Sequence, residues 1–162
     1  MKRSLDNLLE VYMEVEAFDG ALQHCKSLLP LEAIGFLVGR VYKVPKTEHL
    51  WTYVLGCIPG KSRSTRVHVE FVDGAMGEVV NVLRSQYKNS FIVGWYHSHP
   101  GYGCFLSDTD IDSQSAYFKE PYHVALVIDP ARNLFDFYKQ DTSSKYREAS
   151  FCVDNFKGRF SP

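Results

Sequence analysis

Two histidines one residue apart give this sequence its clearest chemical signal. His97 and His99 lie in the segment GWYHSHPGYGCFLSDTDIDSQ, which covers residues 94–114. On a β-strand, residues i and i+2 point to the same face with their Cα atoms roughly 7 Å apart, so the two imidazoles can converge on one ion. A His-x-His pair alone is more often two unrelated polar residues at the end of a strand, so the residues around it decide the interpretation.

A serine and an acid follow the histidines within a few residues. Ser107 and Asp110 form a Ser-x-x-Asp pattern, which can cap the start of a helix without any metal. Together with two imidazoles, however, the carboxylate completes a His-His-Asp set that suits Zn²⁺ and leaves the fourth tetrahedral position to water, as in catalytic zinc sites. Asp108 and Asp112 compete with Asp110 for the ligand role. They lie some 200° around a helix from it, so at most one of the three faces the ion well.

Hydrophobic periodicity indicates the elements that must position these residues. Strands are expected at residues 11–16, 33–44, 49–57, 66–72, 90–99, 122–130 and 134–140. Helices are expected at residues 18–29, 73–88 and 107–118. Residues 58–65 are interpreted as a polar turn and residues 101–106 as a loop. Without internal repeats or a low-complexity linker, this mixture of strands and helices predicts one α/β (α+β) domain.

Composition and charge limit the classes of function. A chain of 162 residues with 45% apolar and 23% charged residues is typical of one soluble domain. The formal net charge of −1 argues against a generally nucleic-acid-binding surface. No apolar run approaches the ~20 residues of a membrane span, and the acids near the N-terminus are atypical of a signal peptide. The 4 cysteines lack CxxC pairing, which favours reduced thiols in a cytoplasmic protein.

The spacing of the site residues resembles the signature of the JAMM (MPN+) zinc metalloproteases. The family pattern is His-x-His, seven residues, Ser, two residues and Asp, and it is matched in full by His97, His99, Ser107 and Asp110. The resemblance continues into LEAIGFLVGR upstream and EPYHVALVIDP downstream. The segment GWYHSHPGYGC is most similar to the branch that includes the proteasome-lid deubiquitinase and the signalosome deneddylase.

This resemblance implies a fold. We expect a single MPN/JAMM domain with a mixed, curved β-sheet flanked by helices, similar to cytidine deaminases. The catalytic domain would cover residues 1–140, and residues 141–162 would form a C-terminal strand or tail packed on the domain or trailing it. The chain lacks the long C-terminal helical extension of eukaryotic relatives, which fits a compact prokaryotic or archaeal homologue or a shortened chain.

The resemblance also implies roles for the site residues. His97, His99 and Asp110 would hold one Zn²⁺ per chain, and Ser107 would donate a hydrogen bond to the oxyanion of the tetrahedral intermediate. The general base would be Glu32 of the upstream motif. By its own chemistry this acid cannot be preferred over the other candidates, Glu70, Glu78 and Glu120.

A substrate groove is expected beside the metal. Trp95 shares the histidines' face of its strand and would either line the groove or pack in the core. Val67, Val69 and Phe71 share one face of a segment that would either pair with an extended substrate peptide or complete the sheet. Asp108 stands where close relatives have glycine, and it would complement the helix dipole or attract basic residues of the substrate. Ser98 faces away from the ligand side, and we expect a packing role for it.

The implied function is isopeptide hydrolysis, with removal of ubiquitin or a ubiquitin-like modifier from a substrate lysine. One alternative is a JAMM peptidase that processes a ubiquitin-fold sulfur-carrier protein, and another is a non-catalytic MPN scaffold. The expected partners are ubiquitin or ubiquitin-like conjugates and the proteasome or another large assembly, without nucleic acid or membrane. The expected location is the cytoplasm, and also the nucleus if the organism is eukaryotic.

Overall fold

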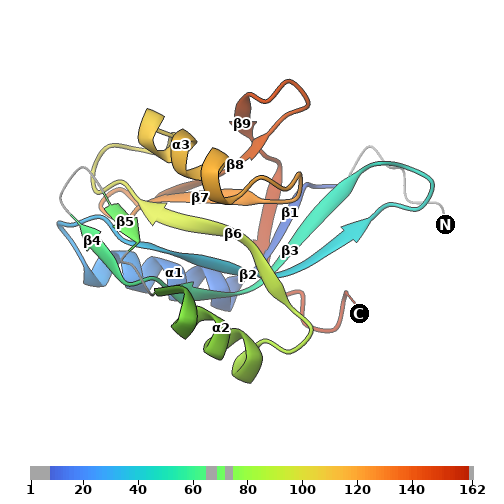
Figure 1. The fold of residues 1–162 in the computed structure, drawn as a ribbon, viewed down its shortest axis with the longest axis horizontal. Coiled ribbons are helices and arrows are strands. Elements are labelled where there is room, and N and C mark those ends of the chain that lie inside the picture. Colours follow the sequence, from blue (N-terminus) through green and yellow to red (C-terminus); the bar gives the residue numbers. More distant parts are fainter. Residues whose placement is uncertain (1–7, 65–68, 72–74, 161–162) are drawn as a thin grey trace.

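A computed structural model describes residues 8–64, 69–71 and 75–160 (Figure 1). The elements in chain order are β1 (Val11–Glu14), α1 (Val15–Ser27), β2 (Ile34–Lys43), β3 (Leu50–Pro59), β4 (Ser62–Ser64), β5 (Val69–Phe71), α2 (Ala75–Gln86), β6 (Phe91–Ser98), α3 (Asp108–Tyr117), β7 (Val124–Asp129), β8 (Leu134–Gln140), β9 (Tyr146–Glu148) and β10 (Phe151–Asp154). Within these residues, no helix is long and apolar enough to cross a membrane.

Eight strands form one mixed, curved sheet in the order β10-β1-β3-β2-β6-β7-β8-β9. β6 lies near its centre, antiparallel to β2 and parallel to β7. β9 and β10, which lie in the segment 141–162, are strands of this sheet, and β10 pairs in parallel with β1. The fold is therefore a mixed α+β domain of the kind expected, and β6, the strand that carries His97, has a partner on each side.

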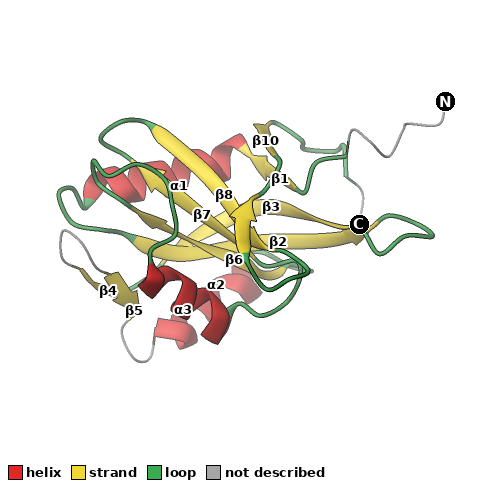
Figure 2. Cartoon of the chain, turned by 90° about the horizontal axis from the view of Figure 1, so that it is seen from above, coloured by secondary structure: helices red, strands yellow, loops and turns green. Residues whose placement is uncertain are grey.

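Helices cover both faces of the sheet (Figure 2). α1 packs on one face through Ala17, Ala21 and Cys25, which recur every four residues and therefore lie on one side of the helix. α2 and α3 lie on the other face, where Val79 of α2 and Phe118, the C-cap of α3, join a second apolar cluster. β6 contributes side chains to the apolar clusters on both faces of the sheet, because its consecutive residues Trp95 and Tyr96 point to opposite faces.

Two expected boundaries were wrong, and β5 lies outside the main sheet. β1 ends at Glu14 and α1 begins at Val15, because the four-residue spacing of buried side chains takes over where the alternation of VYMEVE would continue the strand. β3 runs on to Pro59, and Ser62–Ser64 form β4, so residues 58–65 are not simply a turn. β5, the described part of the segment expected at 66–72, pairs with β4 in a separate two-stranded sheet and does not join the main sheet.

Candidate metal centre

The three predicted metal ligands meet at one end of the sheet. His97 is the penultimate residue of β6, His99 follows the strand, and Asp110 is the third residue of α3. Figure 1 shows the loop that leaves the end of β6 and enters α3. The three residues are 0%, 4% and 9% exposed, and they form a possible metal-binding group with ligand atoms within 4.8 Å of one another.

The distances between the ligand atoms fit a tetrahedral ion. The Nε2 atoms of His97 and His99 are 3.1 Å apart, and they lie 3.2 Å and 3.4 Å from Asp110 Oδ2. Bonds of about 2.0–2.1 Å to a tetrahedral Zn²⁺ place neighbouring ligand atoms about 3.3 Å apart. The three atoms therefore mark one face of such a tetrahedron. Asp108 and Asp112 are exposed, and neither belongs to the group, so the geometry favours Asp110 among the three acids.

The protonation states also suit a cation. Burial lowers the pKa of His97, which favours the neutral imidazole that binds metals. Burial opposes ionisation of Asp110, but hydrogen bonds from His97 and His99 outweigh it and bring the pKa of this carboxyl below its usual value. The Nδ1 atoms of both histidines are buried without a hydrogen-bond partner among the described residues, so the rings are held by packing and by their Nε2 contacts.

Ser107 caps α3 and fixes the ligand carboxylate at the same time. Its hydroxyl donates to Asp110 Oδ2 at 2.6 Å, its N–H donates to the same oxygen at 2.8 Å, and its Oγ accepts from Asp110 N at 3.3 Å. This is the capping box that the sequence indicated. Capping and metal binding are therefore compatible, because one pair of side chains serves both.

Glu32 is the buried acid next to the ligands. It lies in the loop before β2, two residues from Ile34, which pairs with His97 in the sheet. It is 5% exposed, and burial raises its pKa to about 7, while His99 lowers the pKa and Asp110 raises it. Glu78 and Glu120 are exposed, and Glu78 pairs with Lys61 at 2.5 Å. The side chain of Glu70 lies outside the described residues, so burial selects Glu32 over the other two.

Trp95 does not line a groove. Its side chain is 1% exposed, its ring stacks on His97 with centroids 4.5 Å apart, and its Nε1 donates to Gln114 Oε1 at 2.5 Å. The expectation of a groove wall was wrong because an apolar cluster that includes Phe118 covers this face of β6. Trp95 supports the ring of His97 from the core.

The other residues predicted for the groove are placed only in part. Val67 lies outside the described residues. Val69 and Phe71 are the first and last residues of β5, and nothing is described of their side chains. Asp108 is exposed in the first turn of α3, where an acid complements the positive end of the helix dipole.

Asp129 is a site residue that the sequence did not reveal. It is the last residue of β7, fully buried, and its carboxylate accepts hydrogen bonds from the N–H groups of Gly101 (2.9 Å) and Gly103 (2.8 Å). Both glycines have a positive φ, of 85° and 84°, which favours glycine at these positions. Asp129 thereby fixes the loop between His99 and Ser107. Its only sequence signal is an acid at the end of a buried strand.

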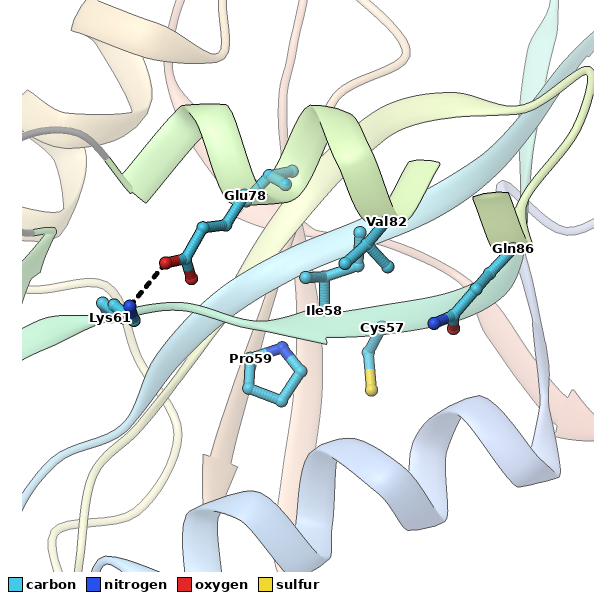
Figure 3. A pocket seen from close by; sticks show the side chains of 8 residues that line it. Cys57, Ile58, Pro59, Lys61, Glu78, Val82 and Gln86 are labelled. Atoms are coloured by element: carbon cyan, nitrogen blue, oxygen red, sulfur yellow. Dashed lines mark hydrogen bonds and ion pairs between the residues drawn. The ribbon is translucent and has the colours of Figure 1, made fainter. Parts of the chain in front are cut away.

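A separate cavity of about 300 Å³ lies between β3 and α2 (Figure 3). It is lined by Cys57, Ile58, Pro59, Lys61, Glu78, Val79, Val82 and Gln86. Figure 3 shows the Lys61–Glu78 ion pair at one end and Gln86 at the other. None of these residues belongs to the metal-binding group, so this cavity is distinct from the candidate centre.

Several proteins of known name are similar in sequence to most of this chain. The 26S proteasome regulatory subunit RPN11 of Eremothecium gossypii is 31% identical over 133 residues, or 80% of this chain and 41% of the relative. COP9 signalosome complex subunit 5 of Yarrowia lipolytica is 37% identical over 120 residues, or 68% of this chain and 31% of the relative. The ubiquitin carboxyl-terminal hydrolase RPN11 of Saccharomyces cerevisiae is 29% identical over 126 residues. The chain thus spans about two fifths or less of these relatives.

A solved structure shares the fold. The solution structure of protein DSY2949 from Desulfitobacterium hafniense matches with a TM-score of 0.65 and 18% identity, and the match covers 90% of this chain and 93% of that one. A family model described as JAB1/Mov34/MPN/PAD-1 ubiquitin protease matches residues 6–121. The match includes Glu32 and all three candidate ligands, and the chain belongs to the JAB1/Mov34/MPN/PAD-1 family, in agreement with the resemblance to the JAMM/MPN+ pattern.

Proposed function

We propose that this chain is a zinc-dependent isopeptidase that removes ubiquitin or a ubiquitin-like modifier from a substrate lysine. The observation that carries the proposal is the convergence of His97, His99 and Asp110 on one ligand face, with the buried acid Glu32 near enough for His99 and Asp110 to shift its pKa. Three protein ligands with an open fourth position are typical of catalytic zinc. The names of the relatives, a ubiquitin hydrolase among them, support the substrate class.

The proposed mechanism divides the work among these residues. Zinc held by the three ligands would supply an acidified water and polarise the scissile carbonyl. Glu32 would take the proton of the attacking water and return it to the departing lysine amine, and a pKa of about 7 suits both transfers at neutral pH.

Ser107 would stabilise the charge that develops on the carbonyl oxygen. A hydroxyl placed in this way donates a hydrogen bond that strengthens as the oxyanion forms. This hydroxyl now donates to Asp110 Oδ2, so it must turn toward the substrate during the reaction. Ser107→Ala is expected to lower kcat about 10²–10³-fold, as at comparable oxyanion sites, with a smaller effect on KM.

The C-terminal tail of the modifier would lie along β5. This strand has one neighbour, β4, among the described strands, so an extended peptide can add to its other edge. Asp108 is exposed in the first turn of α3 and would attract basic residues of the tail. Asp108→Gly is then expected to raise KM and leave kcat unchanged, and an unaltered KM would restrict Asp108 to the helix start.

The setting is part of the proposal. The relatives are named as subunits of the proteasome and of the COP9 signalosome, which supports membership of the proteasome or another large assembly. We place the activity in the cytoplasm, and also in the nucleus if the organism is eukaryotic.

Hydrolysis of a panel of conjugates by zinc-loaded protein tests the function. Lysine-linked ubiquitin dimers and fusions of other ubiquitin-like modifiers would be compared, with Glu32→Gln as the disabling variant. Glu78→Gln is the matched control, because this exposed acid pairs with Lys61 and lies outside the metal-binding group. The proposal predicts hydrolysis that Glu32→Gln abolishes and Glu78→Gln preserves. A zinc-loaded chain inactive on the whole panel would contradict it and favour a scaffold.

A further inference from the structure

Ser98 lies between the two histidine ligands but points away from them. Its side chain is fully buried on the α1 side of β6, where its hydroxyl contacts the thiol of Cys25. The sequence indicated only a packing role for this residue. The structure shows a specific bond, because Ser98 Oγ accepts a hydrogen bond from the backbone N–H of Ala33 at 2.8 Å.

A second bond joins the same two residues. The N–H of Ser98 donates to the carbonyl oxygen of Ala33 at 3.0 Å. Ala33 directly precedes β2, whose first residue, Ile34, pairs with His97. The N–H of Ala33 thus lies at the end of the β2–β6 ladder. Its acceptor there is the side chain of Ser98 and not a backbone carbonyl group of β6.

These bonds link the proposed base to the proposed ligands. Glu32 is covalently attached to the N–H group that Ser98 holds, and Ser98 is flanked by His97 and His99. On the other side, the N–H of His99 donates to the carbonyl oxygen of Ile128 in β7 at 2.8 Å. The ligand segment is therefore anchored to β7, and the loop that carries Glu32 is anchored to the ligand segment.

We propose that Ser98 is a positioning residue for the reaction, whose hydroxyl fixes the backbone of Glu32 relative to His97 and His99. This inference rests on the proposed function. The hydroxyl faces away from the ligand side, so its link to Glu32 runs through the Ala33 bond, while its contact with Cys25 lies on the α1 side of the sheet. Proton transfer needs a base within about 2.6–3.2 Å of the proton's heavy atom, and a misplacement of about 1 Å can lower a rate about 10²-fold.

The test compares Ser98→Ala, which removes the acceptor, with Ser98→Thr, which retains it. The matched control is Thr52→Val, because Thr52 is equally buried and its hydroxyl donates to the carbonyl oxygen of Tyr122 at 2.8 Å. Rates are counted per folded, zinc-loaded chain, and zinc affinity is measured by competition with a chelating dye. Amide hydrogen exchange at Ala33 reports the bond itself without reference to activity.

The positioning role predicts a loss in kcat with little change in KM. Ser98→Ala should lower kcat about 10- to 100-fold, keep KM within about twofold, and leave zinc affinity unchanged. Ser98→Thr should restore most of kcat, and Thr52→Val should change stability only. Exchange at Ala33 should accelerate in Ser98→Ala alone among these variants.

Three results would overturn the positioning role: an unchanged kcat in Ser98→Ala, an equal loss in Thr52→Val, or no recovery in Ser98→Thr. If the wild-type protein is active and Glu32→Gln is not, such a result removes this inference and leaves the proposed function intact. If the wild-type protein hydrolyses no conjugate, the proposed function fails, and unchanged exchange at Ala33 in Ser98→Ala would reject the Ser98 bond separately.

Discussion

The rings of Trp95 and His97 stack with their centroids 4.5 Å apart and their planes 16° from parallel. This contact and the hydrogen bond from Trp95 Nε1 to Gln114 Oε1 connect the core to a candidate ligand and to the helix that carries another. The Nδ1 atom of His97 has no hydrogen-bond partner among the described residues. The orientation of this candidate ligand therefore depends on its packing against Trp95.

Loss of this support is expected to weaken both folding and metal binding. Trp95→Leu should lower the free energy of unfolding by about 2–4 kcal/mol, because a large buried ring is lost. It should also weaken zinc affinity about tenfold, the usual scale for residues that orient a ligand. The two effects are measured by denaturant unfolding of the metal-free protein and by competitive zinc titration.

Trp51→Leu provides the control for this prediction. Trp51 stacks on Tyr42 in an aromatic cluster that includes none of the site residues, with centroids 4.4 Å apart. Its loss should reduce stability and leave zinc affinity unchanged. Equal zinc affinities in Trp95→Leu and the wild-type protein would contradict the orienting role of Trp95.

The loop between His99 and Ser107 should depend on the charge of Asp129. Asp129→Asn replaces one of the two accepting oxygens by an N–H₂ group, which would face the backbone N–H of either Gly101 or Gly103 and cannot accept its hydrogen bond. Hydrogen bonds to a charged group contribute about 1.5–3 kcal/mol, so the variant should lose at least that much stability, and its zinc affinity should fall as the loop loosens. Calorimetry and zinc competition measure the two effects, and an unchanged Tm would contradict the role assigned to this carboxylate.

Acid unfolding should depend on Glu10. Its carboxylate accepts two hydrogen bonds from Arg147, at 2.6 Å and 2.9 Å, and mainly for this reason the pKa of Glu10 is lowered to about 2. A depressed folded-state pKa stabilises the protein above the unfolded value of 4.5, and this contribution is lost as the pH falls from about 4.5 to 2. In Glu10→Gln, stability should therefore fall less steeply over this window. Parallel slopes for the two proteins in pH-dependent urea unfolding would exclude the contribution.

The pH dependence of hydrolysis should show the titration of Glu32. Burial raises its pKa to about 7, and protonation below that value removes the general base. A bound cation lowers the pKa of a neighbouring acid, so the acid limb of kcat/KM should lie at or somewhat below pH 7. The profile is measured from about pH 5 to 9, where the protein should remain folded. A kcat/KM that is flat down to pH 5 would exclude Glu32 as the titrating base.

Much of the site could be predicted because its spacing is local. Two residues of a strand, a short loop and a capped helix start bring together His97, His99 and Asp110, and all three lie within 14 residues of sequence. Glu32 lies far from these residues in the sequence, and by chemistry alone it could not be preferred over several other acids as the general base. Its motif indicated it, and its burial sets it apart from Glu78 and Glu120.

What the sequence could not predict depends on long-range pairing. The roles of Ser98 and Asp129 arise from backbone N–H groups supplied by other segments, and backbone groups leave no sequence signal. The same holds for β10, whose Phe151 pairs with Val11 across 140 positions. For Trp95 the sequence left a groove wall and the core as alternatives, because periodicity gives the face of a strand but does not tell which element covers that face.

The most direct test of the central claim is removal and return of zinc while cleavage of a lysine-linked ubiquitin dimer is followed. The account predicts that chelation abolishes cleavage, that zinc restores it with saturation at one ion per chain, and that His97→Ala neither binds the ion nor recovers activity. Cleavage that persists after complete chelation, or full activity in His97→Ala, would contradict the assignment of His97, His99 and Asp110 as a catalytic zinc centre.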